Sequence, residues 1–215
     1  MSNYIEPLAQ ESTPSIIADK LRMAIGHGEL KPGAQLGEAD LARKLGVSRG
    51  PLREGMQRLT QEGLLVSIRN RGLFVVDMTP DDIRDMYLAR EAIERAAARK
   101  IHMGDTEGPG TVLLEIVDKM SYAEGDPAAV GEIDIEFHEA LVRLAESPRL
   151  SRMHQTFITE TRMCIHALAE TYATADFRVR EHYALAEAIR IGNADFADKL
   201  LIAHMDDAIT RLINR

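Results

Sequence analysis

The sequence predicts a mainly α-helical protein in two parts: three helices and a β-hairpin, followed by an all-α antiparallel helical bundle. Apolar residues recur at helical spacing along most of the chain, whereas two short segments, 64–68 and 72–76, are rich in β-formers. After Thr79-Pro80 the chain reads as amphipathic helix to its end. We therefore place the domain boundary near residue 78.

The first part contains an arm and a small domain. Residues 1–14 hold two prolines and no periodicity, which predicts a flexible N-terminal arm ahead of a domain over 15–78. The domain is expected to contain helices starting near Ser15, at Glu38–Leu45 and at Arg49–Glu62, the last capped by Ser48, and a hairpin that turns at 69–71.

Residues 79–215 form the second part, in which Gly, Pro and Asp separate the helical segments. Six helices are predicted, at 81–103, 110–124, 127–146, 148–173, 176–191 and 193–213. Residues 79–215 are therefore expected to form a single all-helical domain.

Composition excludes several classes of protein. A single cysteine, Cys164, cannot form an intrachain disulfide, which favours a reducing cytoplasm over secretion. The apolar runs are far shorter than the roughly 20 residues that span a bilayer, so no membrane partner is expected. The net charge of -8, from 26 basic and 34 acidic residues, argues at first sight against nucleic acid as a partner.

The charge, however, is unevenly distributed. Residues 1–78 hold 10 basic and 9 acidic side chains, which leaves 16 basic and 25 acidic ones for the remainder. Residues 43–71 alone hold seven basic residues against Glu54 and Glu62. Three helices and a hairpin are the order of a winged helix-turn-helix, whose third helix enters the major groove of DNA. Seven basic residues on these elements favour double-stranded DNA as the partner.

The third helix supplies the predicted base-reading residues. Its Arg49, Arg53 and Gln57 lie at i, i+4 spacing, and arginine and glutamine can read guanine and adenine with about 1–3 kcal/mol of discrimination each. Arginines at the hairpin tip suit the minor groove or the phosphates. The predicted DNA-binding residues are Arg43, Ser48, Arg49, Arg53, Gln57, Arg69, Arg71 and Gly72.

Four potential metal ligands point inward from the second part. On helical wheels, Asp134, His138, His182 and His204 fall within or at the margin of the apolar arcs of three helices. One buried histidine is most often an ordinary core residue, but burying all four unpaired is expensive, and a divalent cation satisfies them together. Three imidazoles and a carboxylate suit Zn, Ni, Mn or Fe.

A buried arginine indicates an anion nearby. Arg90 lies centrally on the apolar face of helix 81–103. Its anionic partner is either Glu94, one turn on, or the carboxylate of a bound ligand, and the sequence favours neither over the other. His154 and Thr161 lie on the inward side of helix 148–173. Arg90, His154 and Thr161 are the predicted effector-binding residues.

The first part resembles the winged helix-turn-helix of GntR-family bacterial transcription regulators. The resemblance spans about residues 15–77 and is carried by L-A-R-K-L-G-V-S-R-G-P-L-R-E, Q-R-L-T-Q-E-G-L and R-G-L-F-V. It implies Arg49 and Arg53 as principal operator contacts and Gly72 as the residue that lets the wing approach the minor groove. Gly50 and Gly55 depart from the family's usual Thr and Ala, and each costs about 1 kcal/mol in a helix relative to Ala.

The second part resembles the all-helical FCD ligand-binding domain of FadR-like members of that family. D-I-E-F-H (134–138), E-H-Y-A-L-A-E-A-I (181–189), A-H-M (203–205) and L-A-R-E-A-I-E (88–94) carry this resemblance. It implies Asp134, His138, His182 and His204 as metal ligands and Arg90 as the effector clamp. The count of six helices is similar to the shorter, VanR-type variant.

These observations predict a homodimeric DNA-binding transcription regulator, a repressor, whose C-terminal domain binds a divalent metal and a small organic-acid or sugar-acid effector. Dimerisation follows from palindromic operators, whose half-sites lie about 34–36 Å apart. Two alternatives remain open: a metal-dependent hydrolase or lyase using the Asp/His₃ site, and a regulator that senses the metal itself. A hydrolase would need a general base apart from the four ligands, and the sequence shows none.

Overall fold

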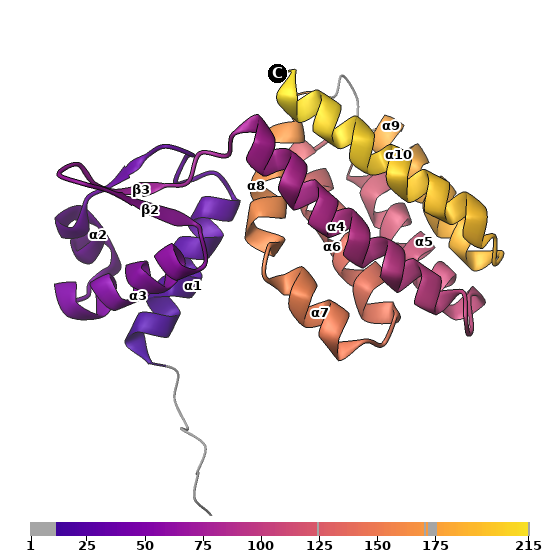
Figure 1. Cartoon of the computed structure of the whole chain (residues 1–215), viewed down its shortest axis with the longest axis horizontal. Helices are drawn as coiled ribbons and strands as arrows, with labels where there is room; N and C mark the ends of the chain where they lie inside the picture. Colours follow the sequence, from indigo (N-terminus) through magenta and orange to yellow (C-terminus); the bar gives the residue numbers. More distant parts are fainter. Residues whose placement is uncertain (1–11, 124, 170, 172–175, 215) are drawn as a thin grey trace, which may run out of the picture. The chain divides into compact units, whose positions relative to one another are not determined.

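A computed structural model describes residues 12–123, 125–169, 171 and 176–214. The chain divides into two compact units between Asp77 and Met78 (Figure 1). The first is a winged helix-turn-helix and the second is all-helical, so the predicted fold class is confirmed.

Three helices and a small sheet form the first unit. The helices are α1 (Thr13–Gly26), α2 (Glu38–Leu45) and α3 (Arg49–Gln61). The predicted stripe of α3, Leu52, Met56 and Leu59, is buried, and α3 packs against α1 and α2. Ser48 is the N-cap residue of α3, but its side chain makes no capping hydrogen bond. This hydroxyl is therefore exposed at the start of the helix.

The sheet has one strand more than predicted. Strands β2 (Leu65–Ile68) and β3 (Gly72–Val75) form the hairpin, and β1 (Gln35–Leu36) pairs with β3 on the other side. A two-residue strand leaves no alternating pattern, which explains why it was missed. The Gln35 side chain donates a hydrogen bond to the Arg71 carbonyl, 2.6 Å away, and so ties β1 to the hairpin turn.

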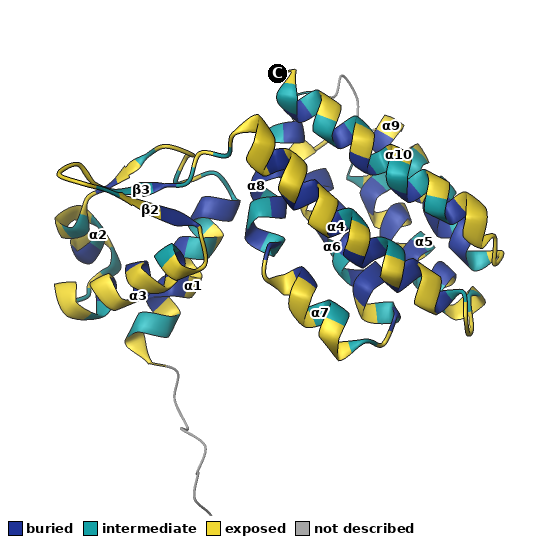
Figure 2. Cartoon of the chain, in the orientation of Figure 1, coloured by how far each residue is buried: buried dark blue, intermediate teal, exposed yellow. Residues whose placement is uncertain are grey.

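The described residues of the second unit form seven helices. They are α4 (Pro80–Ile101), α5 (Glu107–Tyr122), α6 (Pro127–Leu144), α7 (Pro148–Gln155), α8 (Ile158–Ala169), α9 (Asp176–Arg190) and α10 (Ala194–Ile213). Helix α4 begins with a capping box, in which Thr79 and Asp82 hydrogen-bond each other's backbone N–H. Figure 2 shows buried residues on the inward faces of these helices and exposed residues on their outer faces.

Two predicted boundaries were wrong. The single helix expected over 148–173 is two helices, because the chain turns at Thr156-Phe157 and buries Phe157. Neither Gly nor Pro marks that turn, and the count of seven removes the basis for assigning the six-helix variant. The arm expected over 1–14 is too long, because α1 begins at Thr13 with Pro14 in its first turn; residues 1–11 lie outside the described part.

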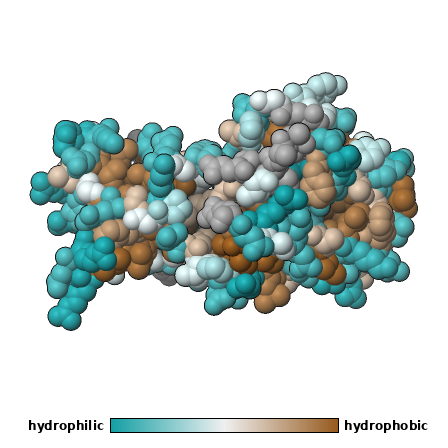
Figure 3. All heavy atoms as spheres, turned by 90° about the horizontal axis from the view of Figure 1, so that it is seen from above, coloured by the Kyte–Doolittle hydropathy of each residue, from teal (hydrophilic) through white to brown (hydrophobic). Residues whose placement is uncertain are grey.

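Exposed hydrophobic side chains are scattered among hydrophilic ones on the face shown in Figure 3. In the described part of the chain, the exposed large hydrophobic residues include Leu88, Met103 and Tyr122. Within the part of the chain that the structure describes, no helix has the length and apolar character needed to cross a membrane.

The two unusual glycines of α3 are expected to respond oppositely to alanine. A Cβ on Gly50 meets nothing within 4 Å, so Gly50→Ala should stabilise the unit by up to about 1 kcal/mol through helix propensity. A Cβ on Gly55 would lie 2.9 Å from Ile17 Cγ2 and 3.0 Å from the Pro14 carbonyl oxygen, so Gly55→Ala should destabilise it by about 1–3 kcal/mol. Urea unfolding of both variants tests this. Equal stabilisation by both would show that α1 does not pack closely on Gly55.

Candidate metal centre and nucleic-acid interface

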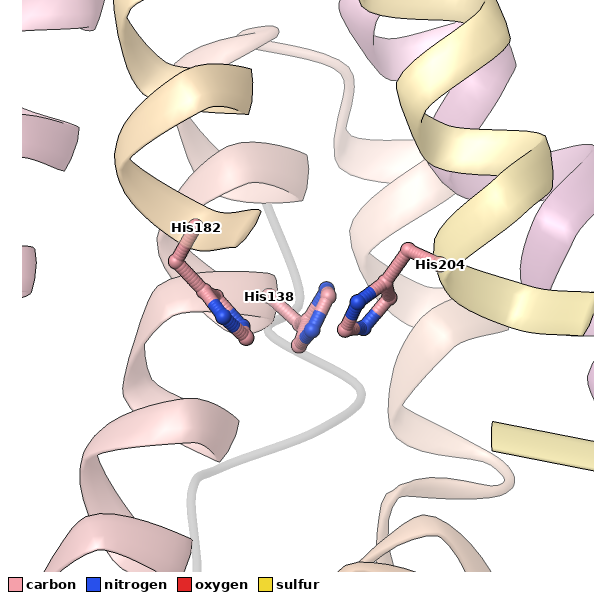
Figure 4. Close-up of side chains that lie close together, drawn as sticks. All are labelled: His138, His182 and His204. Atoms are coloured by element: carbon pink, nitrogen blue, oxygen red, sulfur yellow. The ribbon is translucent and has the colours of Figure 1, made fainter. Parts of the chain in front are cut away.

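Three imidazole rings meet in the core of the bundle. His138 of α6, His182 of α9 and His204 of α10 point toward one another (Figure 4), and their nearest ring nitrogens all lie within 4.8 Å. His138 and His182 are buried, and the side chain of His204 is 12% exposed. The inward placement expected from the helical wheels is therefore confirmed for all three.

Hydrogen bonds at Nδ1 fix which nitrogen of each buried ring faces the cluster. His182 Nδ1 lies 2.8 Å from the Arg178 carbonyl oxygen, which can only accept, so this nitrogen carries the proton. His138 Nδ1 lies 2.7 Å from Glu94 Oε2. Both Nε2 atoms are buried and have no hydrogen-bond partner among the described residues. A ring anchored through Nδ1 to a carboxylate or carbonyl and presenting Nε2 is the usual arrangement of a metal-binding histidine.

Asp134 lies beside the cluster, but an arginine holds it. Its Oδ1 is 3.4 Å from His138 Nε2 and its Oδ2 is 3.7 Å from His182 Nε2. Arg178, also buried, donates to Oδ2 through Nε at 3.1 Å and through Nη2. The structure thus brings the three histidines together and places the predicted fourth ligand in an ion pair with Arg178.

Burial and charge pairing set the protonation states. Burial lowers the pKa of His182 to about 3, so its ring is neutral as a metal requires. Burial also disfavours the charged form of His138, but Glu94 and Asp134 outweigh it and raise the pKa of this ring. Burial alone would raise the pKa of each carboxyl group, yet Arg178 beside Asp134 and Arg90 beside Glu94 hold both pKa values well below their usual range.

The predicted effector residues lie next to this centre. Arg90 donates from Nε to Glu94 Oε1 at 2.7 Å, while its buried Nη2 has no partner among the described residues. His154 Nε2, also without a hydrogen-bond partner there, lies 3.7 Å from the same Glu94 oxygen. Thr161 is buried and its hydroxyl contacts Met86 Sδ. Glu94 therefore pairs with Arg90 through Nε. Arg90 Nη2 and His154 Nε2 remain available to an anion.

The donor set can hold a divalent transition metal. The buried Nε2 atoms of His138 and His182 lie together with the His204 ring, and Asp134 Oδ1 is 3.4 Å from His138 Nε2. Buried polar atoms without partners are costly, and a cation would satisfy them at once. Nitrogen and carboxylate ligands fit Zn, Ni, Mn or Fe.

The predicted DNA-binding residues form an exposed surface in the first unit. All eight are exposed: Arg43, Ser48, Arg49, Arg53, Gln57, Arg69, Arg71 and Gly72. Two of the arginines have local partners, since Arg53 Nε lies 2.7 Å from Glu38 Oε2 and Arg43 pairs with Asp40. Such exposed pairs contribute only about 0–1 kcal/mol, so phosphates or bases can displace them.

A hollow of about 310 Å³ separates the third helix from the wing. Arg53 and Gln57 line it from α3, and Ser67 and Gly72 line it from the hairpin. Gly72 has φ +105°, and a Cβ there would lie 3.2 Å from Gln35 Nε2, so the wing needs glycine for its backbone independently of DNA.

Two residues of the metal centre were missed from the sequence. Arg178 precedes His182 by one helical turn, the same spacing as Asp134 and His138, so the two pairs face each other across the bundle. The i, i+4 spacing in α9 is a sequence signal that places Arg178 beside His182. Glu181, whose Oε2 lies 3.6 Å from His204 Nδ1, gave no comparable signal.

Known proteins similar to this chain are transcription regulators. YdhC of Bacillus subtilis, a regulator of the helix-turn-helix type, is 27% identical over 87% of this chain and 85% of its own. A protein of Paenarthrobacter nicotinovorans named as a D-xylose utilization operon repressor is 27% identical over 92% and 88%. A protein of Escherichia coli named as an L-lactate dehydrogenase operon regulator is 28% identical over 88% and 82%.

A solved structure and two family models agree with these relatives. A GntR regulator of Rhodococcus sp. superposes with a TM-score of 0.80 at 29% identity, covering 95% of this chain and 99% of that one. Residues 15–75 match the model of bacterial regulatory proteins of the gntR family, and residues 85–207 match the FCD domain. The chain therefore belongs to the GntR family of DNA-binding transcription regulators, which are not enzymes, and carries an FCD domain.

Proposed function

We propose that this regulator is a homodimeric repressor whose FCD domain binds a divalent metal and a small carboxylate that controls operator binding. The observation that carries the proposal is the buried cluster of His138, His182 and His204, two of which present unpartnered Nε2 atoms. The first unit supplies the DNA-reading surface, and palindromic operators call for two copies of it.

The effector is proposed to be a small organic acid or a sugar acid. Donors on Arg90 and His154 remain for an anion beside the metal centre, and a carboxylate matches the fork of an arginine. The names of two relatives refer to operons for D-xylose utilization and L-lactate dehydrogenase, which supports testing sugar acids and hydroxy acids first.

The test begins with operator fragments selected by the purified protein from random DNA. Binding of these fragments is then measured with metal alone, with each acid alone, and with both. Release by an acid only in the presence of metal supports the proposal, whereas release by metal alone supports a metal sensor. DNA binding that no acid alters at any metal concentration contradicts the proposed control.

Arg90 distinguishes the two kinds of sensor. Arg90→Lys keeps a charge beside Glu94 but loses the guanidinium fork, so we expect it to abolish the response to acid and to spare the response to metal. Fluorescence anisotropy of labelled operator measures both. An unchanged acid response would remove Arg90 from the effector site.

On the DNA side, Arg53→Ala should weaken operator binding by about 1–3 kcal/mol and relax the base preference at one position, because it removes a base-reading group. Glu38→Gln, which removes the carboxylate paired with Arg53 and one negative charge from the surface, should strengthen binding. Titration of labelled operator at several salt concentrations tests both. Equal operator affinities of the wild type, Arg53→Ala and Glu38→Gln would show that DNA binds away from Arg53 and Glu38.

A further inference from the structure

One buried carboxylate, that of Asp134, pairs with Arg178 and lies beside His138 and His182. We infer that Arg178 competes with the metal for Asp134, and that a carboxylate anion which takes Asp134's place on Arg178 releases Asp134 to the metal. This inference rests on the proposed metal and acid binding. It adds Arg178 to Arg90 and His154 as a residue that contacts the acid, and names Arg178 as the residue that couples the acid to the metal.

The two carboxylate oxygens of Asp134 face different groups. Oδ2 accepts both hydrogen bonds from Arg178, whereas Oδ1 lies on the side of His138 Nε2 and has no hydrogen-bond partner among the described residues. Asp134 belongs to the centre by position but does not join the group of three nitrogens that lie within 4.8 Å of one another. A carboxylate held through both Nε and Nη2 of an arginine is a weaker ligand than one that is released, because its charge is already neutralised.

Charge balance gives the reason for an exchange of anions. Asp134, Glu94, Arg90 and Arg178 are buried and form two ion pairs, and these two pairs carry no net charge before a dication enters. A dication adds two uncompensated charges to the interior, which is unfavourable. An incoming carboxylate supplies a negative charge and replaces Asp134 on Arg178, so the arginine keeps a carboxylate partner.

The linkage is reciprocal. If an acid tightens metal binding through Arg178, metal must tighten acid binding by the same factor. Binding of the acid would thus change the affinity of the metal centre, whose histidines lie on α6, α9 and α10.

The experiment measures the affinity of the full-length protein for Zn²⁺ with a competing chelator, without any effector. Arg178→Gln is expected to bind Zn²⁺ about tenfold more tightly than the wild type, an effect of the size usual for coupled sites, because Asp134 is released. The same substitution in an Asp134→Asn background should have no effect. Weaker or equal binding by Arg178→Gln, or tightening that persists without Asp134, overturns the inference; the latter would show only the loss of a positive charge.

A charge-preserving variant covers the case in which the Asn background does not fold. Arg178→Lys keeps the positive charge but has a single donor group, so it should also bind Zn²⁺ more tightly than the wild type. Tightening in Arg178→Gln alone would assign the effect to charge and overturn the competition for Asp134.

Acetate serves as the carboxylate probe and acetamide as its neutral match. After correction for Zn²⁺ bound by acetate in solution, acetate should tighten Zn²⁺ binding by the wild type and not by Arg178→Gln, and acetamide should have no effect on either. An equal effect of acetate on both proteins, or none on the wild type, overturns the anion exchange. Failure of every variant to bind Zn²⁺ would instead contradict the proposed metal site itself.

Discussion

Replacing Glu94 with alanine is expected to lower the free energy of unfolding by about 3–5 kcal/mol, the cost of leaving one partner of a buried ion pair uncompensated. Arg90 and Glu94 are 1% and 0% exposed, and Nε and Oε1 are 2.7 Å apart. Glu94 also accepts from His138 Nδ1, so its loss leaves a second buried group without its anchor. Urea unfolding monitored by circular dichroism measures the effect.

The same helix supplies a matched control. Glu91 and Arg95 form an ion pair at the same i, i+4 spacing and at 2.8 Å, but their side chains are 22% and 38% exposed. Glu91→Ala should therefore cost no more than about 0.5 kcal/mol. If Glu94→Ala and Glu91→Ala destabilise the protein equally, the Arg90–Glu94 pair does not lie in the core.

The sequence was most informative where the pattern was periodic. The stripe of α3 and the inward histidines followed from spacing alone, because burial repeats at 3.6 residues in helices. The hairpin followed from two short segments rich in β-formers on either side of a turn. The break at Thr156-Phe157 could not be predicted, since it depends on the packing of α7 and α8 against α4 and α6 rather than on a helix-breaking residue. Strand β1 is likewise a product of pairing with β3, without a pattern of its own.

The ionic partners of individual site residues could not be predicted from the sequence either. Helical wheels placed Arg90 and Asp134 inward, but which anion or cation each one contacts depends on side chains from helices distant in the sequence. Arg90 pairs with Glu94, one turn away on the same helix. Its Nη2 has no hydrogen-bond partner among the described residues. Asp134 pairs with Arg178, which lies 44 residues away in the sequence. No pattern in the helix that carries Asp134 could indicate this partner.

Replacing His182 with alanine is expected to weaken binding of the proposed metal by more than about 100-fold, because one of three nitrogen ligands is lost. Metal at 1,000 times its Kd stabilises a protein by about 4 kcal/mol, so the wild type should gain that much on adding Zn²⁺ and His182→Ala should gain almost nothing. The gain on adding metal is the readout, because truncating a buried ring lowers stability by itself.

His166 provides the control for this experiment. It lies on α8, is exposed and does not belong to the cluster, so His166→Ala should keep the full gain. Thermal unfolding with Zn²⁺ and with EDTA measures the gain for all three proteins. A wild type that gains nothing would contradict the proposed metal binding, and a gain that His182→Ala retains would place the metal elsewhere. Loss of the gain in His182→Ala alone would assign the metal to the interior of the bundle, where Asp134 and Arg178 can couple it to an acid.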